Sequence, residues 1–222
     1  MTLKLNGSSS GSVSIDAPAS TAGGADRTLT LPDDASNGVI KTSTYPSSIQ
    51  VLEQFYTPCD GSVIATSNGN VTVGGASLSA GYSLISSYAD VAESVIAYQP
   101  PTGATQVIYE FSFYYTRQLD THPTGHWKLY LDSDQVVDAR FTCASDDAQI
   151  LQTFKWGFNI GGSADTDVGR VASWNSAKTI KFQARRHGSG NDIKLYETYS
   201  WEGASGEIFC RPCIGITAIG AA

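Results

Sequence analysis

Hydrophobic and polar residues alternate along most of this chain with a period of two, which is typical of β-strands that bury one face. The clearest alternating run covers residues 107–115, where Glu110 and Ser112 occupy the more polar parity. Its aromatic and aliphatic residues share the other parity: Val107, Tyr109, Phe111, Phe113 and Tyr115. The pattern predicts a strand with one face in a core and the other face wetter.

Similar runs predict further strands, separated by Gly, Pro, Asn and Asp. The predicted strands are 49–58, 94–98, 127–131, 150–160, 180–184, 193–195 and 208–216, with short edge pieces in 62–85 and a turn at 132–134. The glycine-rich segment 187–192 predicts that 180–184 and 193–195 form a hairpin. Pro212 predicts an edge position or a bulge for the last strand. The segment 88–92 is the one candidate for a helical turn.

Roughly eight to ten strands at this spacing predict a two-sheet sandwich, and a jelly roll is one common solution. The low charged fraction (16%) and the many glycines (22) favour short strands joined by turns over helices. We therefore predict an all-β fold in which residues 49–222 form a jelly-roll-like β-sandwich head.

Residues 1–48 have a different pattern, because their apolar residues form only isolated pairs two positions apart. These pairs are Leu3 with Leu5, Val13 with Ile15, and Leu29 with Leu31. Turn-forming Gly, Ser, Asn and Asp separate them, and an isolated hairpin is marginal in water. We predict an extended or β-hairpin anchor and linker that pairs with copies of itself or with a larger assembly.

Two parts of the chain resemble known proteins. The segments LKLNGSSSGSVSIDAPAS and GGADRTLTLP resemble the N-terminal segment of tail-fibre and related virion proteins of bacteriophages, especially those of marine bacteria. The segments VIYEFSFYY, GHWKLYLD, SAKTIKFQARRHGSGNDIKL and IFCRPCIGITAIG resemble the C-terminal jelly-roll module of the same proteins. The resemblance implies a virion component, a trimer, and a head similar to the tumour necrosis factor-like jelly roll.

Charge and hydropathy narrow the expected partners. The net charge is −7, and no basic cluster exceeds the pair Arg185-Arg186, so we expect no nucleic-acid binding. No apolar run reaches the eighteen residues of a membrane helix, so we expect no membrane insertion. No secretory leader is visible, so we expect assembly in the host cytoplasm.

The four cysteines are Cys59, Cys143, Cys210 and Cys213, and we expect reduced thiols in a cytoplasmic setting. Cys210 and Cys213 match C-x-x-C, but residues three apart in a strand face opposite sides. We therefore predict small buried thiols in a terminal strand and no zinc site.

Other candidate motifs are incomplete. The Gly7–Gly11 match to G-x-S-x-G lies in an exposed Ser/Gly run, and Pro123 excludes a helical metal pair from His122 and His126. His187 is expected to face solvent. The loop at Asp165–Gly169 lacks the later ligands of a calcium loop, so turn chemistry is favoured over a structural calcium.

Glu110 is the one acid whose context suggests burial, and no second carboxylate is specified for glycoside hydrolysis. We predict that the protein is not an enzyme and has no catalytic, cofactor or metal residues. Four tyrosines fall next to the predicted core positions or on the opposite face of their strands: Tyr114, Tyr130, Tyr196 and Tyr199. The sequence leaves open whether they serve the core, a subunit interface or sugar binding.

The leading hypothesis is a trimeric phage fibre with a knob, attached to other virion proteins through residues 1–48 and recognising a host surface glycan or protein through its loops. One alternative is a capsid decoration or head-fibre protein. Another alternative is a cell-surface glycan hydrolase that depends on Glu110.

Overall fold

The computed structural model describes residues 2–6, 12–16, 49–74, 81–117, 124–144, 149–188, 193–197 and 210–221. The chain divides into two compact units, residues 1–46 and residues 47–222. In the first unit, β1 (Thr2–Asn6) pairs antiparallel with β2 (Ser12–Asp16). This hairpin contains two of the apolar pairs expected from sequence, and the third, Leu29 with Leu31, lies outside the described residues.

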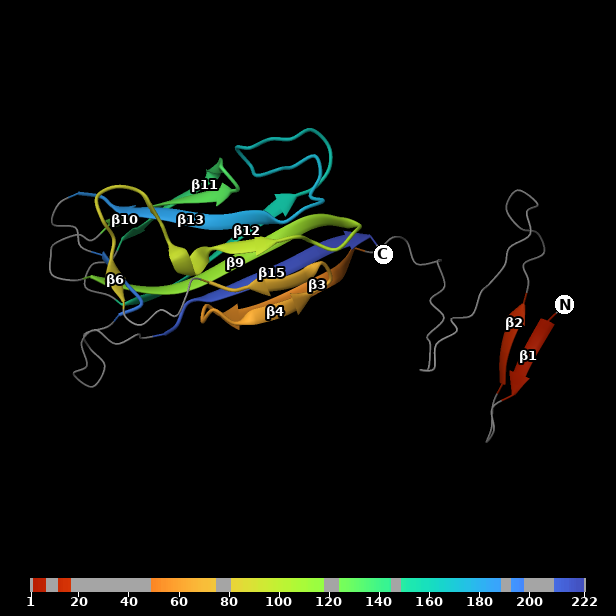
Figure 1. Ribbon diagram of the computed structural model, residues 1–222. Coiled ribbons are helices and arrows are strands. Elements are labelled where there is room, and N and C mark those ends of the chain that lie inside the picture. The colour runs from red at the N-terminus through yellow and green to blue at the C-terminus, as the bar shows by residue number, and fades with distance from the viewer. Residues whose placement is uncertain are drawn as a thin grey trace. The chain divides into compact units, whose positions relative to one another are not determined.

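The second unit consists of two facing sheets, which Figure 1 shows as layers. One sheet contains β3 (Ile49–Pro58), β6 (Tyr82–Ser83), β9 (Ala104–Arg117), β12 (Ile150–Asn159), β14 (Ile193–Leu195) and β15 (Cys213–Ala221). The long strand β9 pairs with β12 on one edge and with β15 and β14 on the other. β3 pairs with the far edge of β15, so the order across the sheet is β12-β9-β15-β3.

The second sheet contains β7 (Ala89–Asp90), β8 (Ile96–Tyr98), β10 (Thr124–Leu131), β11 (Asp134–Ala144) and β13 (Lys178–Arg186). Its order is β11-β10-β13, and β7 and β8 lie one after the other along β13. A hairpin of β4 (Val63–Thr66) and β5 (Gly69–Thr72) pairs separately, and a 3-10 turn covers Ala92–Ser94.

The order of the strands is that of a jelly roll. With β7 and β8 counted as one interrupted strand, chain order places the first, eighth, third and sixth long strands in one sheet. The second, seventh, fourth and fifth strands form the other sheet. This arrangement is the jelly-roll-like sandwich predicted from the alternation.

The core lies between the sheets and is rich in aromatic rings. Phe111 and Phe113 project from β9 toward Trp127 of β10 and Phe182 of β13, and all four are at most 1% exposed. The ring centroids of Phe113 and Trp127 lie 4.5 Å apart. Burying each such side chain contributes about 1.5–3 kcal/mol. The parity predicted for 107–115 and 127–131 is confirmed.

The predicted hairpin between 180–184 and 193–195 is wrong. β13 pairs with β10, β7 and β8, whereas β14 pairs with β9 and β6 in the other sheet. In both strands the buried side chains are those that the alternation predicts, but the two strands pack against the core from opposite sides. Alternation identifies the buried face of a strand and not its neighbour, and the glycine-rich segment connects two sheets.

The expectation that Pro212 marks an edge strand or a bulge is also wrong. β15 begins after it, at Cys213, and lies between β3 and β9. The carbonyl of Pro212 accepts a hydrogen bond from the backbone N–H of Cys59 at 2.8 Å. No helix in the described part of the chain is long and apolar enough to cross a bilayer.

Candidate functional site

The outer face of the sheet β12-β9-β15-β3 is the first candidate site, and we call it the β3–β12 face. Side chains on it alternate with those that fill the core. Tyr56, Gly215, Glu110 and Lys155 lie side by side across the four strands in register. The Lys155 Nζ lies 2.7 Å from Glu110 Oε2, and this hydrogen bond raises the pKa of Lys155.

Large apolar side chains are exposed on this face. Six large hydrophobic residues are prominently exposed in the described part of the chain, and four of them belong to its edge strands β3 and β12. These are Ile49 (79% exposed), Val51 (58%), Tyr56 (55%) and Leu151 (59%). Because isolated exposed apolar residues are common, their gathering on one flat sheet is the informative feature.

Two glycines keep parts of the β3–β12 face flat, Gly215 on the central strand β15 and Gly157 on the edge strand β12. A Cβ atom at Gly215 would lie 2.7 Å from Cδ2 of Tyr56, so the tyrosine ring occupies the space above this glycine. A Cβ atom at Gly157 would lie 3.1 Å from Nε2 of Gln106. Neighbouring side chains therefore lie low over the strands, and the surface suits a flat partner.

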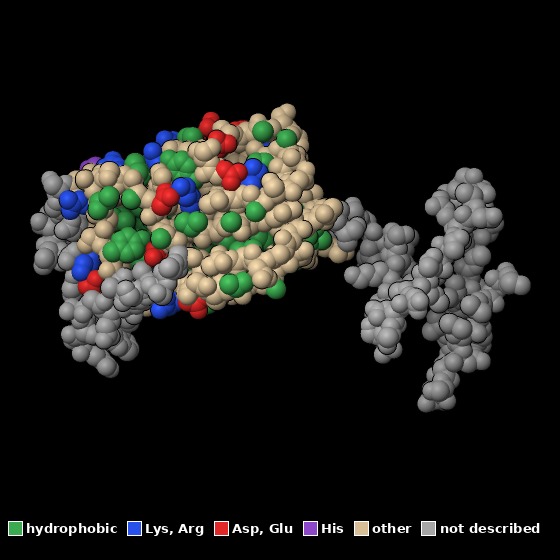
Figure 2. All heavy atoms as spheres, in the orientation of Figure 1, with side chains coloured by type: hydrophobic (Ala, Val, Ile, Leu, Met, Phe, Trp, Pro, Cys, Tyr) green, Lys and Arg blue, Asp and Glu red, His purple; other side chains and the backbone are tan. Residues whose placement is uncertain are grey.

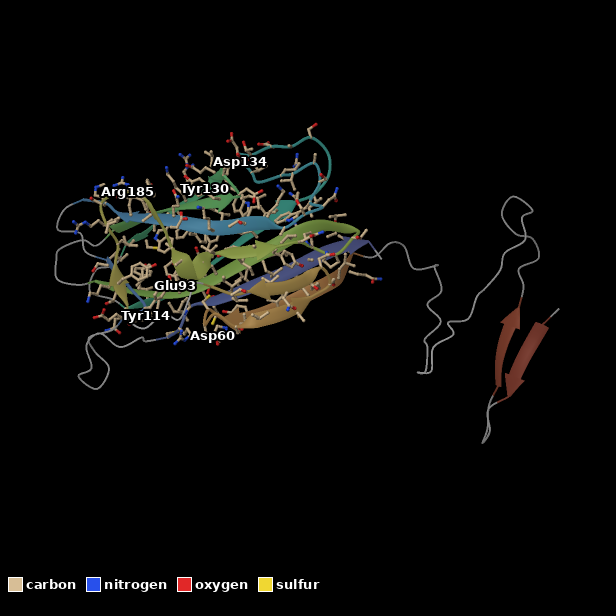
Figure 3. The ribbon with its side chains drawn as sticks, viewed as in Figure 1. Asp60, Glu93, Tyr114, Tyr130, Asp134 and Arg185 are labelled. Carbon is tan, nitrogen blue, oxygen red and sulfur yellow. The ribbon has the colours of Figure 1, made fainter. Side chains whose placement is uncertain are left out.

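The two outer faces of the sandwich differ in charge. Among the described strand residues, Glu110 and Lys155 are the only charged side chains on the β3–β12 face, and they pair with each other. The opposite face, over β10 and β13, is strongly charged, as the blue and purple side chains along that edge show (Figure 2). Arg185 projects from that layer, whereas Tyr114 lies on the other layer (Figure 3).

Glu110 was the carboxylate that sequence reasoning singled out for hydrolysis. Its side chain is 23% exposed and paired with Lys155 on an open sheet face. Two other carboxylates, Glu93 and Glu197, are far more buried, at 5% and 3% exposure. Sequence reasoning missed both, although Glu197 continues the buried parity of β14.

The buried carboxylates are satisfied by their own chain. Tyr82 donates its hydroxyl to Glu93 Oε2 at 3.0 Å, and Lys194 Nζ lies 2.8 and 2.9 Å from the two carboxylate oxygens of Glu197. Burial, reinforced by Glu93, raises the pKa of Tyr82. Figure 3 shows Glu93 between the two layers. These contacts satisfy the buried acids within the fold.

The prediction that Cys210 and Cys213 are buried thiols of a terminal strand is wrong for Cys210, which is exposed, while Cys213 begins β15 and is half-buried. Cys59 and Cys143 are buried. Cys210 precedes β15 with a φ of 54°, so the pair does not share a strand. No group of three or more potential metal ligands occurs among the residues that the structure describes.

The structure brings together two histidines that sequence reasoning kept apart. His126 pairs in register with Arg185, which places His126 Nε2 2.8 Å from Nδ1 of the exposed His187. Burial, followed by the charges of Arg185 and His187, lowers the pKa of His126. His122 lies outside the described residues.

The acidic loop forms a turn. The backbone N–H of Asp167 donates to Asp165 Oδ1 at 3.1 Å, and Gly169 has a φ of 72°.

Of the four tyrosines whose role the sequence leaves open, Tyr114 (5% exposed) and Tyr196 (0%) are buried. Tyr130 is half-buried, and Tyr199 is outside the described residues.

Comparison with known proteins finds no matching family and no matching curated protein. Among solved structures, the chain is similar to one in the structure of infectious bursal disease virus Gx strain, with 10% identity and a TM-score of 0.32. That match covers 88% of this chain and 41% of the viral chain. A chain of the Gt strain gives 9% identity, a TM-score of 0.30 and coverage of 98% and 44%. This chain therefore spans less than half of those viral chains, and likenesses this distant carry no part of the case for function.

Proposed function

We propose that this protein is a non-enzymatic structural component of a virus particle that assembles as a homotrimer through the β3–β12 face. Residues 1–48 attach it to other virion proteins, and the sandwich forms a head that faces the host surface. The virion assignment draws on the resemblance of the terminal segments to phage fibre proteins. The jelly-roll order is the architecture that such a head needs.

The observation that carries the oligomer is the chemistry of the β3–β12 face. Interface cores are depleted of charge and enriched in aromatic residues, and this face has one internal ion pair beside Tyr56 and exposed Val51 and Leu151. Four strands about 4.8 Å apart and about ten residues long cover roughly 600 Å² before side-chain relief is counted. This area approaches the roughly 800 Å² that each partner buries in a stable interface.

The test places one positive charge on the face and measures solution mass by light scattering. We expect the unmodified chain to give three times its mass of 23.5 kDa. Val51→Lys and Leu151→Lys should shift it to the monomer, because an unpaired ammonium would be buried between subunits. Circular dichroism should show an unchanged β fold, since both side chains are exposed in one chain.

The matched control is Val63→Lys. Val63 is 59% exposed, as Leu151 is, but lies on β4 outside the β3–β12 face. We expect this variant to keep the mass of the unmodified protein. A monomeric unmodified chain, or equal dissociation by all three variants, would contradict the assigned interface.

A further inference from the structure

A pocket of about 290 Å³ opens on the charged outer face of the sheet β11-β10-β13. It lies where β11 bulges. Between the pairs Trp127–Phe141 and Leu129–Val136, β10 contributes only Lys128, whereas β11 contributes residues 137–140. Bulges bend a strand and redirect its side chains. This one places Arg140 at the rim beside Lys128.

The bulge is held by hydrogen bonds within the chain. The backbone N–H of Asp138 donates to the carbonyl of Asp167 at 3.0 Å, and Arg140 Nε donates to the carbonyl of Val137 at 2.7 Å. The shape of the pocket is therefore set before any ligand arrives. A preformed site avoids part of the ordering cost of binding.

Cationic groups gather around one aromatic ring in this pocket. Lys128 Nζ lies 4.1 Å from the centroid of the Tyr88 ring, and Arg185 Cζ lies 5.3 Å from it. No carboxylate in the described part of the chain pairs with Lys128, Arg140 or Arg185. These charges are concentrated in a chain whose net charge is −7, so they mark a local reversal of potential.

Other lysines of the same sheet show what an ordinary structural charge looks like here. Lys178 lies 2.9 Å from Asp132, and Lys181 lies 2.7 Å from Asp90. Each of these cations is thus neutralised by a carboxylate of a neighbouring strand or turn. The pocket differs because its Lys128 and the adjacent Arg185 lie over the ring of Tyr88 instead of beside a carboxylate.

We propose that this pocket binds an acidic saccharide unit that carries a carboxylate or a sulfate. Arginine and lysine donors match such oxyanions, and the ring of Tyr88 offers an apolar surface for the sugar. The volume is near the lower limit of about 300 Å³ for small-ligand sites, which fits one sugar of a polymer. Binding of an acidic saccharide does not depend on the proposed function. Only the use of that binding for host recognition rests on it.

The test is calorimetric titration of the full-length protein with three probes. Oligogalacturonate carries carboxylates, dextran sulfate oligosaccharide carries sulfates, and neutral dextran is the uncharged control. We expect binding of one or both acidic probes and none of neutral dextran. Lys128→Ala and Arg185→Ala should each weaken binding about tenfold, because each removes one charge-assisted contact. Tyr88→Phe should keep binding, whereas Tyr88→Ala should weaken it.

The control variant is Lys178→Ala, which removes the same charge from β13 about 23 Å away from Arg185 along the strand. We expect it to bind as the unmodified protein does. Equal weakening by Lys178→Ala and Arg185→Ala would indicate attraction by net charge and overturn the site. Absence of binding to both acidic probes would also overturn it.

Acidification provides a second readout. His126 lies 2.8 Å from Nδ1 of His187, which follows β13, pairs in register with Arg185, and lines the pocket with Lys128, Arg140 and Tyr88. Burial and the charges of Arg185 and His187 lower its pKa, and a bound anion would offset those charges. We expect binding to strengthen from pH 7.5 to pH 5.5, and His126→Gln to remove part of that gain. Unchanged mass in light scattering would show that lost binding is independent of the oligomer.

Discussion

The four thiols of the chain occupy distinct environments, so their reactivity should differ. Burial raises the pKa of Cys143 to about 12 and raises that of Cys59 as well. Cys210 is exposed. We expect iodoacetamide at pH 8 to modify Cys210 first, and Cys59 and Cys143 only after unfolding, because the thiolate is the reactive form. Peptide mass mapping over time measures this, and native labelling of Cys143 as fast as Cys210 would contradict it.

Individual residues show what sequence can and cannot predict. The burial of Phe111, Phe113 and Trp127 follows from parity alone. The contact of His126 with His187 does not, because 61 positions separate them and only the register of β10 with β13 brings them together. Cys210 was misplaced because the strand pattern extends through Pro212, whereas the strand starts after it.

At the scale of elements, an enclosed ion pair joins the short strand β14 to Glu197, two residues after its end. The side chains of Lys194 and Glu197 are only 14% and 4% exposed. We expect Glu197→Gln to lower the free energy of unfolding by about 3 kcal/mol, because the buried ammonium of Lys194 loses the carboxylate that lies 2.8 and 2.9 Å from it. Urea unfolding followed by fluorescence measures the change.

Two further variants separate this effect from a general charge effect. The double variant Lys194→Met with Glu197→Gln should recover most of the loss, because the buried ammonium and the buried carboxylate are removed together. Glu110→Gln breaks a pair whose lysine is 62% exposed, and it should alter the unfolding midpoint much less. Equal midpoints for Glu197→Gln and the unmodified chain would refute a stabilising role for the pair.

The alternation of residues predicts the bounds of strands better than it predicts which strands pair. The range 49–58 was predicted with the bounds that β3 has. The partners of β13 and β14 were not predicted. Each strand buries every second side chain against the same core, but the two strands belong to different sheets. Parity carries no information about which strands exchange hydrogen bonds when a connection crosses between layers.

At the scale of the whole molecule, the sandwich should fold and associate without the preceding segment. Every residue of the described hydrophobic core lies at position 59 or later. We expect a shortened chain that begins at Ile49 to remain folded and to keep the solution mass of the full chain in light scattering. If only the full chain associates, the first 48 residues hold the oligomer and the β3–β12 face does not.

The sandwich architecture was predictable because many short alternating runs admit few packed solutions. The contrast between its two outer faces was not. Glu110 and Lys155 lie 45 positions apart, and only the pairing of β9 with β12 turns them into a self-neutralised pair on an otherwise uncharged surface. Surface chemistry of this kind is a property of the assembled sheet.

The position of β15 between β3 and β9 has a consequence for synthesis. The sheet is joined by contacts between the opening and closing strands of the sandwich, such as Phe55 with Ile216. During translation, β3 and β9 emerge before residues 213–221, the strand that pairs with both of them. Long-range closures of this kind slow folding and leave strand edges unpaired for a time. A nascent sandwich is therefore exposed to wrong pairing with other unfinished copies until β15 has been made.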